Sequence, residues 1–180
     1  HAMYAEKIKV EYLDLGKFKA YATGLDKDWP MLIVCGGIVS IKEQWQQFMH
    51  LSAKLKLAVV ITEMPGVGEN KQLYHPTQCT MFSNIIDALH HRVDTHQTHL
   101  MALSFSGHLA ILNAGIDPRI VGITTVGAPI QDFFSAYSKN TTPLVTQRTL
   151  AHLTQQPCHE LDTYMQDWGL LSQNIPHLQI

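Results

Sequence analysis

The sequence is poor in charged residues and in cysteine, and neither sign of charge dominates. Charged side chains make up 16% of the 180 residues, and the formal net charge is -2. This balance gives no electrostatic basis for binding nucleic acid or an anionic membrane. The three cysteines, Cys35, Cys79 and Cys158, cannot all pair within one chain, and none lies in a Cys-x-x-Cys motif. We therefore expect reduced thiols and a cytoplasmic protein.

Long apolar segments are also missing. No apolar run reaches the ~18 residues of a membrane-spanning helix, so we expect no membrane segment. The first three residues, His-Ala-Met, lack the basic and apolar parts of a secretion signal and are typical of a cloning remnant before the native start. The hydrophobic fraction of 46% is that of a globular protein, and the length indicates one domain with a substantial core.

Strand-like and helix-like segments alternate through most of the chain. Residues 8–13 and 18–23 are predicted to form a β-hairpin with Gly16 in its turn. Further strands are predicted at 31–35, 57–62, 99–103 and 120–126, and helices at 42–55, 77–92 and 107–114. An antiparallel start followed by alternating strands and helices predicts an α/β fold with a mostly parallel, doubly wound sheet.

The pattern changes after Gln131. No further strand is predicted there, and residues 143–155 and 160–171 are predicted to form short helices. We therefore expect an α/β core over residues 1–130 and a helical cap or insertion over residues 131–180. The strand at 120–126 would then be an apolar edge, which a partner chain, a homodimer or the cap helices must cover.

The strongest local signal is Ala102-Leu103-Ser104-Phe105-Ser106-Gly107, between a predicted strand and a predicted helix. A nucleophile elbow needs small residues two positions before and after its serine, because larger side chains would clash in so tight a turn. Ala102 and Ser106 meet this requirement in place of the usual glycines, and Ser104 would be held in a strained conformation. The alternative is an ordinary strand-to-helix turn with Ser104 as the N-cap.

Backbone donors for an oxyanion hole are predicted at two places. One donor in such enzymes is the N–H after the nucleophile, here Phe105, and the other comes from the loop after an earlier strand. That loop contains Gly36, Gly37 and Ile38, where glycine lets the backbone approach a substrate oxygen. We predict an oxyanion hole formed by Phe105 with Gly37 or Ile38. The alternative is a glycine pair that only ends the strand.

A second glycine-containing segment, residues 63–69 with the sequence EMPGVGE, follows the next predicted strand. It lacks the Gly-Lys-Ser/Thr ending of a phosphate-binding loop and does not open a helix directly. We therefore predict a sharp turn at the edge of the sheet rather than a nucleotide site.

Four segments occur in a fixed order: residues 36–43, residues 63–69, the turn at Ser104, and residues 127–129. Together they resemble the FrsA-like branch of the α/β-hydrolases, esterase-like proteins with a helical cap, over roughly residues 29–134. The resemblance implies an α/β-hydrolase sheet that starts with an antiparallel pair. It also implies an ester or thioester hydrolase, or an acyltransferase, with Ser104 as the nucleophile. This chemistry requires no metal or organic cofactor, and its substrate would be a small ester or thioester.

The sequence leaves three alternatives for the acid and the base that would act with Ser104. In this fold both follow the nucleophile in the chain, and a serine needs an adjacent base to attack at neutral pH. One alternative places both groups on a segment or a chain outside these 180 residues. A second uses Asp132 as the acid, with a base chosen from His152, His159 and His177, of which His177 is preferred. The third is a binding or assembly module on the same scaffold, without catalysis.

Other histidines and Asp132 have structural explanations too. Asp132 could be the N-cap of the helix that follows it. His108 is expected on a helix face, pointing away from Ser104. The group His90, His91, His96 and His99 is expected at a solvated helix end, because no carboxylate or cysteine completes a metal-ligand set at suitable spacing.

Overall fold

A six-stranded sheet organises the computed structural model, which describes residues 8–137 and 140–172. The strand order is β1-β2-β4-β3-β5-β6. The strands are Glu11–Asp14 (β1), Lys19–Thr23 (β2), Pro30–Cys35 (β3), Ala58–Thr62 (β4), Asp94–Ala102 (β5) and Ile120–Thr124 (β6). The pairs β1–β2 and β2–β4 are antiparallel, and the pairs β3–β4, β3–β5 and β5–β6 are parallel. This is the predicted α/β sheet, with its antiparallel first pair joined through Gly16 at φ 76°.

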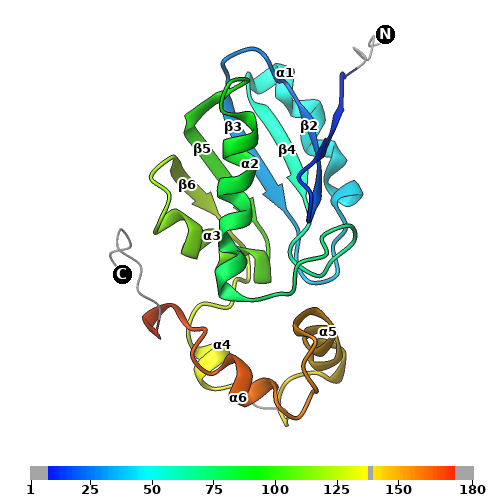
Figure 1. Ribbon diagram of the computed structural model, residues 1–180, viewed down its shortest axis with the longest axis vertical. Helices are drawn as coiled ribbons and strands as arrows, with labels where there is room; N and C mark the ends of the chain where they lie inside the picture. Colours follow the sequence, from blue (N-terminus) through cyan, green and yellow to red (C-terminus); the bar gives the residue numbers. More distant parts are fainter. Residues whose placement is uncertain (1–7, 138–139, 173–180) are drawn as a thin grey trace.

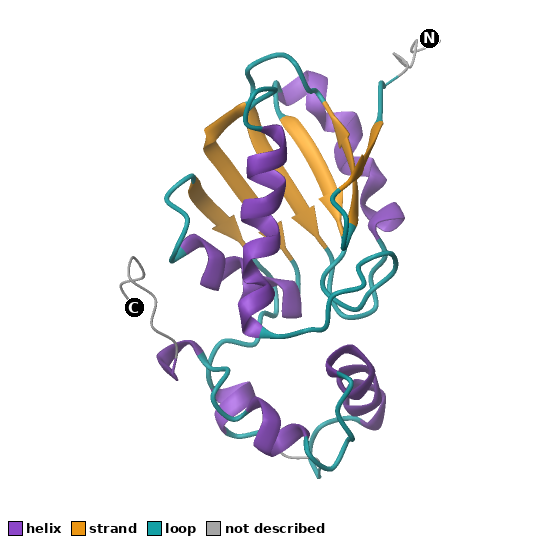
Figure 2. Ribbon diagram, in the orientation of Figure 1, coloured by secondary structure: helices purple, strands orange, loops and turns teal. Residues whose placement is uncertain are grey.

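Helices cover both faces of the sheet, as a doubly wound fold requires (Figure 2). On one face, α2 (Met81–Leu89) and α3 (Phe105–Ala114) pack against the main core, which includes Ile33 and Val60. On the other, the 3-10 helix η1 (Lys42–Leu51) and the short α1 (Ser52–Leu55) lie beside a smaller core with Val34 and Val59. Neighbouring residues of β3 and β4 thus enter opposite cores, because strand side chains alternate between faces.

A helical layer lies at the end of the sheet where the parallel strands finish (Figure 1). It contains α4 (Asp132–Ser135), α5 (Leu144–Thr154), α6 (Leu161–Met165) and the 3-10 turn η3 (Leu170–Ser172). Within the described residues no strand follows β6, as the sequence predicts. Leu150, Leu161 and Met165 are fully buried and belong to the main core. The helical layer therefore packs on the sheet, and its treatment as a separate unit from residue 131 stays a prediction.

Two predicted elements differ from the structure. The helix predicted at 42–55 is a 3-10 helix over its first ten residues. Its inward side chains Lys42, Trp45 and Phe48 are spaced by three, which matches the 3.0 residues per turn of a 3-10 helix. Part of the helix predicted at 77–92 is likewise a 3-10 segment, η2 (Pro76–Thr80), ahead of α2.

A third predicted element, the strand at 99–103, also differs, and it changes the location of histidines expected at a solvated helix end. Helix α2 ends at Leu89, and β5 begins at Asp94, five positions before the predicted start, so His96 lies in the strand together with His99, which opens the predicted strand. Thr95 and Thr98 are buried there while His96 is exposed. This part of β5 is made of polar residues and its register shifts between Thr98 and His99, so a prediction based on apolar runs did not find it.

The three cysteines differ in their exposure. Cys35 and Cys79 are buried and Cys158 is partly buried, and all three are unpaired. Over residues 8–137 and 140–172, no helix is both long and apolar enough to cross a membrane.

Candidate functional site

Ser104 lies in a sharp turn between β5, which ends at Ala102, and α3, which begins at Phe105. Its φ of 58° and ψ of -131° form a conformation that costs a residue with a Cβ about 1–3 kcal/mol. Ser104 occupies the N-cap position of α3, but its side chain accepts no capping hydrogen bond. Helix capping therefore does not account for a serine here, and the turn has the strained conformation that a nucleophile elbow requires.

Hydrogen bonds hold this turn to the ends of both neighbouring strands. The Leu103 N–H donates to the Cys35 carbonyl at the end of β3 (3.0 Å), and the Ser104 N–H donates to the Val126 carbonyl after β6 (2.9 Å). The buried Ser106 hydroxyl also donates to the Cys35 carbonyl (3.0 Å). A Cβ at Gly107 would lie 2.7 Å from the Ala128 Cβ, so only glycine lets α3 approach this closely. These contacts fix the position of Ser104 relative to the sheet.

The loop after β3 lies against Ser104. A Cβ at Gly37 would lie 2.9 Å from the Ser104 Cβ, which is shorter than side chains tolerate. The N–H groups of Gly37, Ile38 and Phe105 donate to no group in the part of the chain that the structure describes. The structure thus brings together the two segments that the sequence singles out, and it leaves their backbone donors free.

Cys35, just before this loop, is an alternative nucleophile to consider. It is fully buried at the end of β3. Burial raises the pKa of the Cys35 thiol to about 12, so it stays protonated at neutral pH. A protonated and inaccessible thiol is a poor nucleophile, whereas Ser104 is a partly exposed residue.

The turn at residues 63–69 encloses a buried carboxylate. Glu63 is 1% exposed, and a Cβ at Gly68 would overlap its side chain. Gly66 and Gly68 have φ values of 82° and 54°, which confirms the predicted sharp turn. A negative charge inside the loop opposes phosphate binding, in agreement with the missing Gly-Lys-Ser/Thr ending.

Lys42 balances this carboxylate. Its buried Nζ lies 3.4 Å from Glu63 Oε2, 2.5 Å from Glu69 Oε2 and 3.3 Å from Glu43 Oε1. Burial lowers the pKa of Lys42, but the hydrogen bond to Glu69 and the charges of Glu63 and Glu43 outweigh it, so the pKa is raised. The hydrogen bond from Lys42 in turn lowers the pKa of Glu69. The lysine therefore stays charged although almost none of it contacts solvent.

His108 is buried and structural, whereas the sequence suggested a helix face. Its Nε2 lies 2.8 Å from the Trp168 carbonyl, and its Nδ1 lies 3.2 Å from the Tyr74 hydroxyl. Because a carbonyl can only accept, Nε2 carries the proton and Nδ1 accepts from Tyr74. Burial lowers the pKa of His108 to about 4. The apolar residues around it, Leu109 to Leu112, are the signal of a helix buried on all sides.

Aromatic side chains connect the helical layer to the residue after Ser104. The Phe105 ring meets Phe133 of α4 at 5.1 Å and Tyr74 at 6.0 Å, both edge to face. Tyr74 in turn packs on Trp168 at 5.3 Å. Helix α4 therefore lies beside the candidate site. Sequence reasoning did not find these anchors, because the rings come from four separate segments.

The predicted acid and bases are not joined to one another. Asp132 is the exposed first residue of α4, and Gln131, not Asp132, is the N-cap of that helix. His152 is exposed on α5, and His159 is exposed with its Nε2 3.5 Å from Glu160 Oε1. In the described ranges no hydrogen bond links Asp132 to a histidine. His177, the preferred base, lies outside the described residues.

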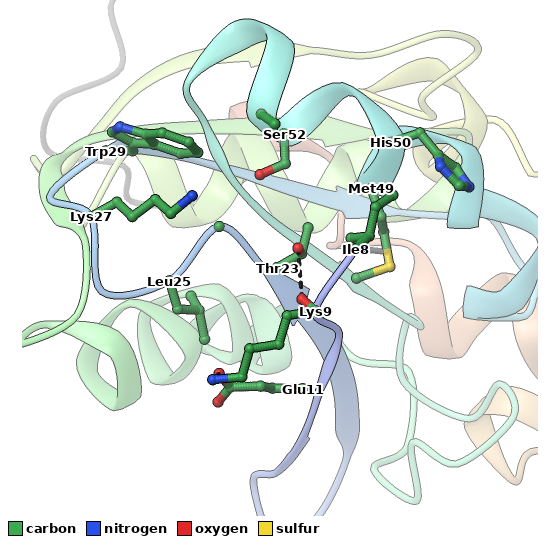
Figure 3. Close-up of a pocket in the computed structure, with 12 residues that line it drawn as sticks. Ile8, Lys9, Glu11, Thr23, Leu25, Lys27, Trp29, Met49, His50 and Ser52 are labelled. Atoms are coloured by element: carbon green, nitrogen blue, oxygen red, sulfur yellow. Dashed lines mark hydrogen bonds and ion pairs between the residues drawn. The ribbon is translucent and has the colours of Figure 1, made fainter. Parts of the chain in front are cut away.

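A cavity of about 310 Å³ lies beside Trp29, just before β3 begins (Figure 3). Ser104 follows the other end of a parallel strand, after β5. It is lined by Thr23 to Leu25 after β2, by the junction of η1 and α1, and by charged side chains that include Lys9 and Lys27. The Thr23 hydroxyl donates to the Lys9 carbonyl across it (2.8 Å). No residue of the Ser104 turn or of the Gly37 loop lines this cavity.

The fold is shared with several solved structures. A protein named AbyA5 matches with a TM-score of 0.85 and 42% identity, over 91% of this chain and 50% of AbyA5. A 2,6-dihydroxy-pseudo-oxynicotine hydrolase matches with a TM-score of 0.73 and 16% identity, over 89% of this chain and 47% of that one. The alpha/beta hydrolase GrgF from Penicillium sp. sh18 matches with a TM-score of 0.56 and 13% identity, over 73% and 49%. No protein-family model and no curated protein matches the chain.

The chain therefore has the α/β-hydrolase fold that the sequence predicts. It spans about half the length of AbyA5, at 50% of that chain. The comparisons do not distinguish the FrsA-like branch from others, so membership in that branch stays a prediction.

Proposed function

We propose that the protein is a serine hydrolase or acyltransferase that acts on a small ester or thioester through an acyl-enzyme on Ser104. The observation that carries the proposal is the turn at Ser104, strained at φ 58° and in contact with Gly37. Solved structures with the same fold include proteins named as hydrolases, which supports this reaction class.

The reaction begins with attack of the Ser104 hydroxyl oxygen on the substrate carbonyl carbon, while a base removes the proton. The carbonyl oxygen becomes an oxyanion, which accepts hydrogen bonds from the N–H of Phe105 and from Gly37 or Ile38. Removal of one such donor typically costs about 3 kcal/mol of transition-state stabilisation. Loss of the alcohol or thiol leaves the acyl-enzyme, and water or an acceptor hydroxyl then releases the acyl group. No cofactor enters these steps.

The base and the acid remain alternatives within the proposal. Two exposed histidines of the helical layer, His152 and His159, make no contact with Asp132. We therefore favour an acid and a histidine contributed from outside these 180 residues, by the same protein or by a partner. Asp132 with His177 is the alternative within the chain.

Labelling by a fluorophosphonate probe tests the nucleophile. In the complete protein that carries this chain, we expect Ser104→Ala to abolish labelling without unfolding, because a partly exposed hydroxyl contributes little stability. Ser135→Ala, at an exposed serine of α4, is the matched control and should label normally. Unchanged labelling of Ser104→Ala would require another nucleophile. An unlabelled wild type would favour the second candidate function below.

The second candidate is a binding or assembly module that uses the open edge of the sheet. Strand β6 pairs with β5 on one side and has no second partner among the described strands. Val121 on it is 55% exposed. Such an edge pairs readily with another strand, so a partner chain or a second copy would cover it. Light scattering after size exclusion of the purified 180-residue chain should show a dimer. A monomer would argue against self-pairing.

The free cysteines indicate the cellular compartment of the protein. The free Cys35, Cys79 and Cys158 fit a reducing compartment, and we propose a cytoplasmic protein on that basis. Formation of a disulfide in the protein isolated under non-reducing conditions would contradict this.

A further inference from the structure

Glu63 connects the two loops that follow β3 and β4. It is the first residue after β4, and its carboxylate is almost completely buried. Oε1 accepts the backbone N–H of Lys42 (3.2 Å), where the loop of residues 36–41 ends. Oε2 accepts the backbone N–H of Glu69 (2.9 Å), near the end of the second loop. One carboxylate thus bonds to the main chain of both loops.

The loop of residues 36–41 is held at its other end by the turn at Ser104. The Cys35 carbonyl, just before the loop, accepts from the Leu103 N–H and from the Ser106 hydroxyl. Inside the loop, the Ser40 N–H donates to the Gly37 carbonyl (3.1 Å). A Cβ at Gly36 would lie 2.5 Å from Trp45 Nε1, so Trp45 of η1 packs closely against the loop. The donors of Gly37 and Ile38 therefore lie between two fixed points, Cys35 and Lys42.

The Lys42 ammonium compensates the charge of the buried Glu63 carboxylate. An unpaired carboxylate in the interior is strongly destabilising, and its partner must be buried with it. The Lys42 ammonium lies 3.4 Å from Glu63 Oε2, and Lys42 is itself 1% exposed. Glu69 shares the same ammonium from a half-exposed position, but its side chain makes no hydrogen bond to residues 36–42 other than to that ammonium. Glu63 and Glu69 thus both pair with the Lys42 ammonium, but only the Glu63 side chain also accepts main-chain N–H groups from both loops.

We propose that Glu63 is a positioning residue that holds the Gly37 and Ile38 N–H groups at the place where an oxyanion forms. The proposal rests on the proposed function of Ser104. An oxyanion donor is effective only when its position is fixed before the reaction, to within about 0.5 Å. Glu63 acts on the main chain at Lys42, four residues from Ile38, and touches no reacting atom.

The test compares Glu63→Gln with Glu69→Gln in the complete protein. Glutamine keeps the size of Glu63 and one acceptor oxygen, but it cannot accept from both loops and from the ammonium. We expect amide hydrogen exchange of Ser40 and Lys42, whose N–H groups donate to the Gly37 carbonyl and to Glu63, to speed up about tenfold in Glu63→Gln, since hydrogen bonds to charged groups contribute at least that factor. The maximal rate of Ser104 inactivation by a fluorophosphonate should fall about tenfold, with the half-saturating probe concentration unchanged. Glu69→Gln should change both quantities less than about threefold.

The exchange measurement keeps the two proposals separable. If Ser40 and Lys42 exchange at the wild-type rate in Glu63→Gln, the positioning role is wrong whatever Ser104 does. If the wild type is not labelled, the proposed function fails, and exchange alone decides whether Glu63 holds the loop. Uniformly faster exchange, in α2 and β5 as much as in the loop, would mean a general structural role and would overturn the proposal. If Glu63→Gln does not fold, the double variant Glu63→Gln/Lys42→Met, which leaves no lone buried ammonium, takes its place with the same expected results.

Discussion

Replacement of Trp168 by alanine is expected to lower the free energy of unfolding by about 3–5 kcal/mol. Trp168 is 4% exposed, and its ring meets Tyr74 at 5.3 Å and His75 at 5.2 Å. Its carbonyl also accepts from buried His108. The indole packs the helical layer against Tyr74 and His75, and its loss leaves a cavity among aromatic rings that cannot close easily. Urea denaturation at pH 7 measures the effect.

Trp29→Ala is the matched control for this change. Trp29 lies in the loop before β3, partly exposed, with the Lys27 ammonium 4.4 Å from its ring centre. A contact of this kind contributes about 0.5–1 kcal/mol at an exposed site. Trp168→Phe, which keeps a ring, should recover part of the stability. Equal losses for Trp168→Ala and Trp29→Ala would mean that the helical layer does not depend on Trp168.

The second large effect is a loss of stability in mild acid caused by His108. The pKa of His108 is lowered by burial to about 4 in the folded chain, while an unfolded histidine titrates near 6.5. Because the folded pKa is depressed, the stability that neutral His108 provides is present above about pH 6.5. It is lost as the pH falls toward 4, since the unfolded chain then binds a proton that the folded chain cannot. The shift corresponds to about 3 kcal/mol.

His108→Gln isolates this contribution, because glutamine does not titrate in this range. We expect the wild type to lose about 3 kcal/mol of unfolding free energy between pH 7 and pH 4 in excess of the loss in His108→Gln. The difference between the two proteins removes other titrating groups, including His75, whose pKa burial also lowers. Asp117, with its pKa lowered to about 2 mainly by a hydrogen bond from Arg119, titrates below this window. His96→Gln, at an exposed histidine of β5, should follow the wild type. Parallel curves for wild type and His108→Gln would show that His108 is not a buried neutral group.

The sheet was predictable because its evidence is local. Short apolar runs such as residues 31–35 and 57–62 are typical of buried strands. Helix-like spacing between such runs indicates helical connections, which join parallel strands. The turn at Ser104 was predictable for the same reason, because the size of Ala102 and Ser106 is a requirement imposed by immediate neighbours. The position of Gly37 followed from topology, since consecutive parallel strands end at one edge of the sheet.

The contacts that join distant segments could not be predicted. Lys42 and Glu63 are 21 positions apart and both resemble ordinary surface residues in a sequence, yet they are among the most buried side chains of the chain. His108 bonds to a carbonyl 60 positions away, in a segment with no regular pattern. The acid and base that the proposed function requires belong to the same class of problem, because their placement depends on how loops converge rather than on any local spacing.

Position 104 also bears on how stability and activity are related in this chain. Glycine reaches a φ of 58° without the clash that a Cβ creates, so Ser104→Gly should make the fold more stable by about 1 kcal/mol. Random mutagenesis with selection for stability would therefore favour Ser104→Gly, and this substitution removes the hydroxyl. A stabilised variant obtained by screening for heat resistance alone would be at risk of losing this side chain first. Engineering for thermal stability should therefore leave Ser104 unchanged. Substitutions at exposed apolar residues, such as Leu144 and Val145 of α5, are better candidates.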